Sequence, residues 1–337
     1  MSSTLNGNEE IQNGGESSKS VAVSHTVDSG LYEHAINSTN WIYNVGYLHQ
    51  DWADVNLTFF QSGLKAHRIL LAKSPYLSNI MRNVAPGSNI HLNFADENIN
   101  QESVHITLQH LYNPSHDLIK QNNAKSILAT SYLFGGMPEL VNHSYEIIKS
   151  SIDPSNIIEM IEWLSQPVDI LSNGFRNGNG DLNNTNHNQI LNKENWEENE
   201  NRYGEWTAKL KKDVIDYLLN QLFEKYSIYD LTKSNEILNL FSKLPYELFK
   251  FILESNKLKI NSMQERFSFT KKIINQRKKL NNNNNNNSNS NSNLIIKNNN
   301  LVLLEESVVL AFKGGEGMEI HISRKPKKTR QLWKVES

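Results

Sequence analysis

The chain has 337 residues, of which 38% are hydrophobic. This length exceeds that of a usual single domain, and the polar stretches predict folded domains separated by solvated segments. The 34 basic and 36 acidic residues give a formal net charge of -2, which excludes a global field that draws the chain to nucleic acid or to an anionic membrane, so any basic function must be local. The absence of cysteine excludes disulfides, thiol nucleophiles and zinc sites that contain cysteine.

The first 29 residues are rich in Ser, Asn, Gly and Glu and show no apolar periodicity, so we expect a disordered leader. They lack the apolar core of a secretory signal, and no stretch of the chain approaches the roughly 20 apolar residues that cross a bilayer. We therefore expect a soluble protein of the cytoplasm, the nucleus or both, with no membrane partner.

Regular structure is predicted to begin near residue 31. Apolar residues then recur near helical spacing, namely Leu31, Ala35, Trp41, Ile42, Val45 and Leu48. A polar run at 37–40 leaves two alternatives open, one helix or two short ones.

Residues 54–60 alternate apolar and polar side chains, which predicts a half-buried strand, and a turn at 61–63 leads to a second strand near 64–67. A short helix at 69–72 follows. Ser74 and Pro75 then have the pattern of an N-cap and a first helical residue. A third strand is predicted near 90–94, and helices near 104–112, 124–134 and 138–148, with Gly135 and Gly136 ending the second of them.

Beyond residue 150 the pattern is mainly helical. A helix is predicted near 156–164, and residues 166–201 are rich in Asn, Gly and charge, which indicates a linker or an inserted loop. Further helices are predicted at 206–223, 237–244, 245–252 and 263–279, the last with a capping box formed by Ser262 and Glu265. Residues 281–293 contain only Asn and Ser and should be disordered, and two β-like runs at 302–312 and 318–323 predict a hairpin.

No motif in the sequence carries recognisable catalytic chemistry. The histidines, among them His91, His105, His110 and His116, lack the spacing of a metal site. No Gly-rich phosphate loop, nucleophile elbow or kinase motif is present. We therefore predict a protein that is not an enzyme and needs no cofactor or metal.

Five short motifs resemble the signature of BTB/POZ domains. They are Asp54-Val55, Ala66-His67-Arg68, Leu70-Leu71-Ala72, Ser74-Pro75-Tyr76-Leu77 and Leu108 to Tyr112, followed by an Ala-containing helix at 124–134. The resemblance covers residues 31–150. Residues 155–164 and 244–279 are similar to the helical BACK-type extension of fungal BTB adaptors, but no kelch repeats follow.

The resemblance implies an α+β fold in which a small sheet flanked by helices precedes a mostly helical region. The expected boundaries are a leader at 1–29, a BTB/POZ domain at 30–150, a BACK-like region at 151–280 interrupted by the linker at 166–201, a disordered Asn/Ser-rich tract at 281–300, and a β-like segment with a basic tail at 301–337. A homodimer is implied, with an interface formed by Leu31, Ala35, Trp41, Ile42, Val45 and Leu48.

Other residues receive roles by the same resemblance. Asp54, His67 and Arg68 are expected to support a pocket on the dimer side, in a structural and not a catalytic role. The family also binds cullins, and Met81, Val84 and Tyr112 are the candidate cullin-facing residues. The family's hydrophobic-x-Glu cullin motif is missing, because residues 81–87 contain no Glu.

These observations lead to two hypotheses. The first is a homodimeric substrate adaptor for a cullin-3-type ubiquitin ligase, in which residues 203–337 recruit an unknown protein target. The alternative is a dimeric scaffold or nuclear transcriptional co-regulator that binds no cullin, with a nuclear-import run formed by Arg324, Lys325, Lys327, Lys328 and Arg330. Direct nucleic-acid binding is not expected, because no zinc finger, homeodomain pattern or basic zipper is present.

Overall fold

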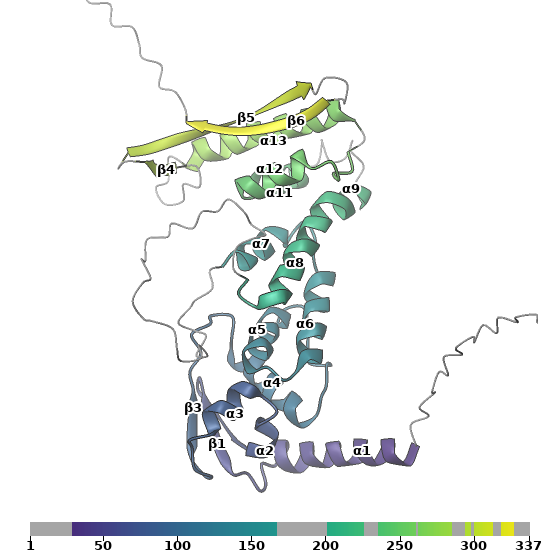
Figure 1. The fold of residues 1–337 in the computed structure, drawn as a ribbon, viewed down its shortest axis with the longest axis vertical. Helices are drawn as coiled ribbons and strands as arrows, with labels where there is room; N and C mark the ends of the chain where they lie inside the picture. Colours follow the sequence, from purple (N-terminus) through teal and green to yellow (C-terminus); the bar gives the residue numbers. More distant parts are fainter. Residues whose placement is uncertain are drawn as a thin grey trace, which may run out of the picture.

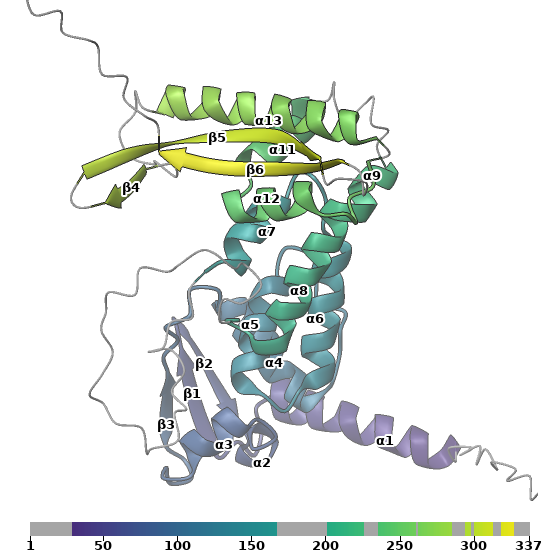
Figure 2. The ribbon, with the colours of Figure 1, turned by 45° about the horizontal axis from the view of Figure 1, so that its top comes forward.

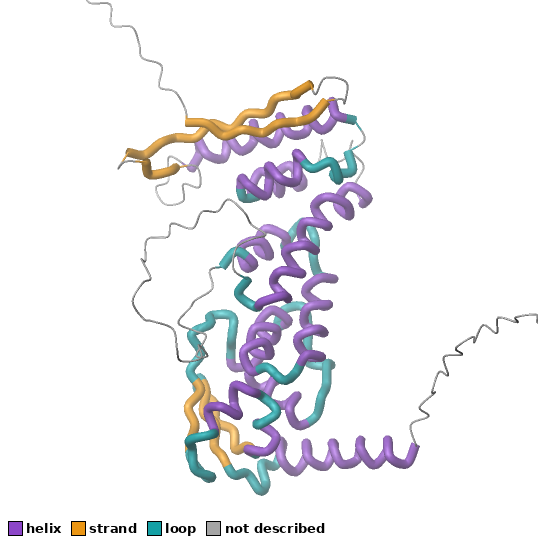
Figure 3. Tube along the Cα trace, in the orientation of Figure 1, coloured by secondary structure: helices purple, strands orange, loops and turns teal. Residues whose placement is uncertain are grey.

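The computed structural model describes residues 29–166, 201–225, 235–260, 262–284, 294–297, 300–312 and 318–326. The expected leader and linker lie almost entirely outside these residues. The molecule is elongated, with a small sheet and its helices at one end and a second sheet at the other (Figure 1). A column of helices joins the two ends, and most of the described chain is helical (Figure 3).

The N-terminal domain alternates helices with three short strands, as the periodicity predicts. Its elements are α1 (Ser29–Trp41), η1 (Ile42–Leu48), β1 (Val55–Phe59), β2 (Ser62–Ala66), α2 (Arg68–Leu71), α3 (Pro75–Met81), β3 (Asn89–Leu92), α4 (Gln101–Tyr112), α5 (Ala124–Phe134) and α6 (Pro138–Ser150). The strand order is β2-β1-β3, with β1 antiparallel to β2 and parallel to β3. Val55, Leu57 and Phe59 point into the core, which confirms the period-two pattern.

The first helix is continuous. η1 consists of π-helical turns that begin directly after α1, and Trp41 at the junction keeps helical dihedral angles. The polar run at 37–40 does not interrupt it, because the Thr39 hydroxyl donates to the Ala35 carbonyl 2.9 Å away within the helix. Of the two alternatives, one long helix is therefore correct.

Predicted caps fix the ends of two helices. The Ser74 hydroxyl accepts the Leu77 N–H and donates to the Phe134 carbonyl at 2.6 Å, which ties α3 to the end of α5. Gly136 has a φ of +74°, and a Cβ there would lie 2.2 Å from the Lys73 carbonyl oxygen. Only glycine fits this approach, so the sequence stops α5 where the loop before α3 passes close by.

The helical region continues from the N-terminal domain. It contains α7 (Ile157–Leu164), α8 (Gly204–Asp216), η2 (Tyr217–Gln221), α9 (Leu222–Lys225), α11 (Asn235–Lys243), α12 (Tyr246–Glu254) and α13 (Met263–Asn284). α8, η2 and α9 follow one another without a break, and α8 packs against α6 and α7. The Glu265 N–H donates to the Ser262 hydroxyl at 3.1 Å, so the predicted cap opens α13.

The second sheet has the order β4-β5-β6 and is built from β4 (Leu294–Lys297), β5 (Asn300–Phe312) and β6 (Met318–Pro326). β5 and β6 form the predicted hairpin, with Val308 opposite Ile322. They pack on α12 and α13 (Figure 2). The expected disordered tract at 281–300 differs from the structure at both ends, because α13 continues to Asn284 and residues 294–297 form β4.

Candidate functional site

The most unusual surface of the N-terminal domain is α1, which projects away from the domain (Figures 1 and 2). None of its side chains is buried. Its large apolar residues are exposed, and we call this set the α1 surface: Leu31, Tyr32, Ile36 and Trp41. A helix of this length is marginal alone in water unless an apolar face is packed. The part of the chain that the structure describes therefore leaves the α1 surface unpacked.

The expected interface residues divide into two groups. Leu31, Ala35, Trp41 and Leu48 are exposed. Ile42 and Val45 are half-buried, and Ile42 packs against the core of its own domain. The helical periodicity predicted a helix here but not which of its residues face outward.

Two large exposed side chains were missed by the sequence analysis. Trp52 is 85% exposed and Ile69 is 82% exposed. Trp52 has a φ of +64°, an uncommon conformation for a bulky residue, in a loop held by hydrogen bonds. The Asp51 carbonyl lies 2.7 Å from the His67 Nε2 atom, and the Gln50 side chain accepts the Lys65 N–H at 3.1 Å. No periodic pattern marks an isolated residue in such a loop.

Asp54 and Arg68 connect backbone segments rather than each other. The Asp54 carboxylate accepts the Arg68 N–H at 2.8 Å, which satisfies the first turn of α2. The Arg68 guanidinium donates to the carbonyls of Met81 and Val84 at 2.7 and 2.8 Å and so holds the end of α3. Asp54 is exposed, so its carboxylate is not a buried charge.

His67 is placed by Tyr112. The Tyr112 hydroxyl accepts the His67 N–H at 2.9 Å and lies 3.1 Å from its Nδ1 atom. Burial, the largest cause, and the charge of Asp54 raise the pKa of Tyr112 to about 12, although the His67 N–H lowers it. The phenol therefore stays protonated at neutral pH, and the His67 ring is held in a structural position.

The candidate cullin-facing residues do not form one surface. Met81 and Tyr112 are buried, with 4% and 2% of their surface exposed, and Val84 is half-buried. Buried side chains cannot contact a partner without a rearrangement of the core. The assignment of Met81 and Tyr112 to a partner-facing surface is therefore corrected.

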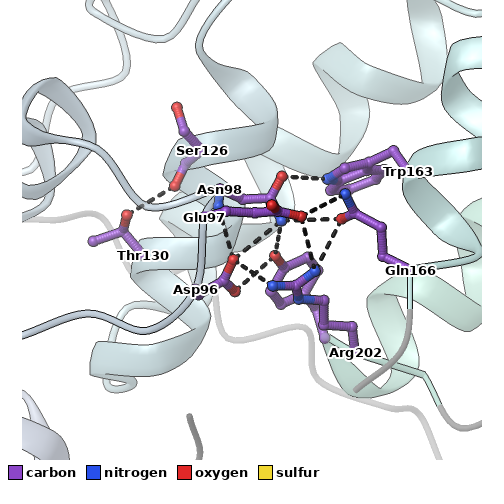
Figure 4. A network of polar contacts seen from close by, with 9 residues as sticks. Asp96, Glu97, Asn98, Ser126, Thr130, Trp163, Gln166 and Arg202 are labelled. Carbon is purple, nitrogen blue, oxygen red and sulfur yellow. Dashed lines mark hydrogen bonds and ion pairs between the residues drawn. The ribbon is translucent and has the colours of Figure 1, made fainter. Parts of the chain in front are cut away.

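A polar cluster joins the N-terminal domain to the helical region (Figure 4). We call it the joint, and it consists of Asp96, Glu97, Asn98, Trp163, Gln166, Arg202 and Tyr203. The Asp96 carboxylate accepts hydrogen bonds from Arg202 and from the Tyr203 hydroxyl, both at 2.8 Å. The side-chain carbonyl of Asn98 accepts the indole N–H of Trp163 at 3.0 Å.

The joint also brings the two sides of the expected linker together. Arg202 donates to the Gln166 side chain at 2.9 Å, so the chain leaves and re-enters the fold at one place. Burial, the largest cause, and the nearby Asp96 raise the pKa of Tyr203, which keeps its hydroxyl a donor. These residues lie far apart in the sequence and in loops or at helix ends, so no local pattern could have identified them.

The expected nuclear-import run begins inside the folded sheet. Arg324 and Lys325 belong to β6. Arg324 donates to Glu306 at 3.0 Å, and its guanidinium lies over the Tyr246 ring. Lys327, Lys328 and Arg330 lie outside the described residues.

The histidines named as weak metal candidates have local partners. His91 lies 3.0 Å from the Thr58 hydroxyl, His105 lies 3.3 Å from the Ser62 hydroxyl, and His110 lies 3.0 Å from Glu139. His116 stacks between His110 and His143. Within the described part of the chain, no group of three or more His, Asp or Glu side chains is arranged to hold a metal ion.

Comparisons with known proteins agree with this architecture. The family model for the BTB/POZ domain matches residues 44–152. The chain is similar to BTB/POZ domain-containing protein 2 of Schizosaccharomyces pombe, with 24% identity over 309 residues that cover 89% of this chain and 92% of the relative. None of the described helices is both long enough and apolar enough to cross a membrane. Residues 44–152 are therefore a BTB/POZ domain, a protein-interaction domain, and a mostly helical region follows them.

Proposed function

We propose that the chain is a homodimeric adaptor that acts by binding and not by catalysis. A second copy covers the α1 surface, and the helical region with its C-terminal sheet binds another protein. The observation that carries this proposal is that α1 buries no side chain in its own chain while four large apolar residues on it are exposed. Self-association is a general property of BTB domains and supports the same partner.

A second copy fits this surface better than an unrelated protein. In a symmetric dimer, two identical helices bury the same apolar face against each other, so the α1 surface of each copy is covered by that of the other. The rigid side chains of Trp52 and Ile69 offer further apolar area on the same domain, and large aromatic side chains often dominate interface energies. Dimerisation then presents two helical regions to a target, which raises the effective concentration of the second contact.

The dimer is tested with the full chain by light scattering after size exclusion. Tyr32→Asp combined with Ile36→Asp places two charges on one face of α1. Because neither side chain is buried in its own chain, we expect a folded monomer with an unchanged circular dichroism spectrum. The matched control, Leu118→Asp with Val309→Asp, changes two exposed apolar residues elsewhere and should remain a dimer. A wild-type monomer, or a dimeric Tyr32/Ile36 variant, would show that the proposal is wrong.

The finer form of the proposal is a substrate adaptor for a cullin-3-type ubiquitin ligase. The BTB family supports it, whereas the missing Glu in residues 81–87 and the burial of Met81 and Tyr112 weigh against the usual contact. Capture of the tagged chain from its cells, followed by mass spectrometry, distinguishes a ligase adaptor from a scaffold that binds no cullin. A cullin that co-purifies with the wild type but not with the unfolding variant Leu57→Asp supports the ligase role. Recovery of a second copy without a cullin favours a scaffold.

A nuclear co-regulator remains the alternative form of the scaffold. The pairing of Arg324 with Glu306 makes this residue a poor part of an extended import signal. The remaining basic residues carry the test, in which fluorescent fusions of the wild type are compared with a Lys325→Ala, Lys327→Ala, Lys328→Ala variant. Loss of nuclear fluorescence supports import through this run, and an unchanged distribution rejects it.

A further inference from the structure

Two basic runs that are far apart in the sequence meet at the C-terminal end of the molecule. The first lies in α13, where residues 266–284 contain six Lys or Arg and no Asp or Glu. The second begins with Arg324 and Lys325 at the end of β6. Arg277 of α13 and Arg324 of β6 bind the same carboxylate, that of Glu306, at 2.7 and 3.0 Å. The fold therefore joins the two runs around one buried acid.

The arginines and the lysines of this region differ in burial and in what they contact. Arg277 is buried, and it binds Glu306 and the carbonyls of Ser242 and Leu244. The lysines are exposed, and we call this set the basic face: Lys271, Lys272, Lys278, Lys279 and Lys325. Buried arginine thus fixes the geometry, while lysine presents charge to the solvent.

The lysines are regularly spaced along α13, as the charges of a regular polyanion are along its backbone. The lysines of α13 form two adjacent pairs, Lys271 with Lys272 and Lys278 with Lys279. The second pair follows the first by seven residues, which is about 10 Å along the helix axis. Between the two pairs, the side chains that are not buried are the polar ones of Asn275 and Gln276. The exposed acid Glu305 binds Lys278 at 3.2 Å, and a surface ion pair of this kind contributes little.

We propose that the basic face binds the phosphate backbone of a nucleic-acid duplex without reading its sequence. Lysine neutralises phosphate as a point charge, and the face offers no exposed arginine fork or aromatic ring that would read or stack a base. The net charge of the whole chain is near zero, so the proposed binding depends on the local excess of lysine on the basic face and not on a global field.

Two other anionic partners fit the face less well. A membrane surface favours apolar side chains beside the lysines, because these insert between lipids, and the exposed side of α13 between Lys271 and Lys279 carries none. A protein with an acidic groove for extended peptides would need an extended basic segment, whereas four of the five lysines belong to the helix α13.

The test measures binding of the full chain to a short fluorescein-labelled DNA duplex of mixed sequence by anisotropy. Each phosphate contacted contributes about −0.9 to the slope of log affinity against log salt. We expect a slope of about −4 between about 50 and 200 mM salt, and equal competition by unlabelled duplexes of unrelated sequence.

Replacing Lys271, Lys272, Lys278 and Lys279 by Gln should reduce the slope to about −1 and the affinity at low salt at least about tenfold. The matched control replaces Lys65, Lys120, Lys212 and Lys257 by Gln, which removes the same charge from exposed positions elsewhere. This control should bind within about threefold of the wild type, since nonspecific binding depends on where the cations lie.

Three results would overturn the proposal. The first is that the wild type does not bind the duplex at low salt. The second is that the α13 variant and the control lose affinity equally, and the third is that polyglutamate competes as well as unlabelled DNA. A further arm uses vesicles that contain phosphatidylserine. Binding to these vesicles without binding to the duplex would assign the face to a membrane and reject the duplex.

Discussion

Arg277 donates to both carboxylate oxygens of Glu306, with Nε 2.7 Å from Oε2 and Nη2 3.1 Å from Oε1. Both side chains are buried, and the Arg277 guanidinium also lies over the Phe249 ring. The pair therefore connects α13, β5 and α12. Two parallel charge-assisted hydrogen bonds fix the orientation of the sheet on the helices as well as its distance.

Glu306→Ala is expected to destabilise the packing of the C-terminal sheet on α12 and α13 by about 3 kcal/mol, because it leaves the buried Arg277 without its counter-ion. Urea denaturation of the full chain measures the change. Glu305→Ala is the matched control, because this acid is exposed and binds Lys278, and a loss below about 0.5 kcal/mol is expected. Equal losses in the two variants would contradict the role of the buried pair.

A second prediction concerns the joint. Asp96→Ala removes an acceptor for Arg202 and for the Tyr203 hydroxyl, so we expect a loss of about 2 kcal/mol. Hydrogen exchange should increase at the start of α8 before it increases in β1. Glu162→Ala, which removes an exposed acid of α7 outside the joint, should leave both quantities nearly unchanged, and a similar effect of both variants would argue against a specific joint.

A third prediction uses the contact between Gln166 and Arg202. Because the joint brings these residues within hydrogen-bond distance, a short Gly-Ser linker can replace residues 167–200. Closing a shorter loop costs less conformational entropy, so we expect the free energy of unfolding to increase by about 1 kcal/mol. Urea denaturation of the wild type and of the variant with the short linker measures this free-energy change. A large destabilisation would mean that the replaced residues contribute packing.

The sequence predicted much of the N-terminal domain because its signals are local. β1 alternates buried and polar side chains, Ser74 caps α3, and α5 ends at Gly135. Each of these depends on residues within a few positions of one another. Short-range periodicity and caps were enough to place the strands and helices in order.

The joint and the Arg277–Glu306 pair could not be predicted in this way. Asp96 and Tyr203 are 107 positions apart, and each looks like an ordinary polar residue in its own segment. The side on which α1 exposes its apolar residues was also open, because periodicity gives a spacing and not the direction of the core. The candidate cullin-facing residues failed for the same reason, since Met81 and Tyr112 belong to the core.

The last prediction concerns acid sensitivity at His116. Its ring lies between those of His110 and His143, with centroids 5.7 and 4.4 Å away, and its Nε2 atom is buried without a hydrogen-bond partner among the described residues. Burial, the largest cause, and the two neighbouring histidines lower the pKa of His116, while Glu139 and Asp117 oppose them.

The unfolded chain therefore takes up a proton at His116 at a higher pH than the folded chain does. Stability is retained at neutral pH and falls as the pH drops below about 6.5, the ordinary value for histidine. We expect the melting temperature to decrease between neutral pH and mildly acidic pH, and the decrease to be smaller in His116→Gln, which cannot be charged. His91→Gln changes an exposed histidine and should keep the wild-type pH dependence. If His116→Gln follows the wild type across this range, the histidine stack does not set the acid sensitivity, because protonation of His116 is the step that the substitution removes.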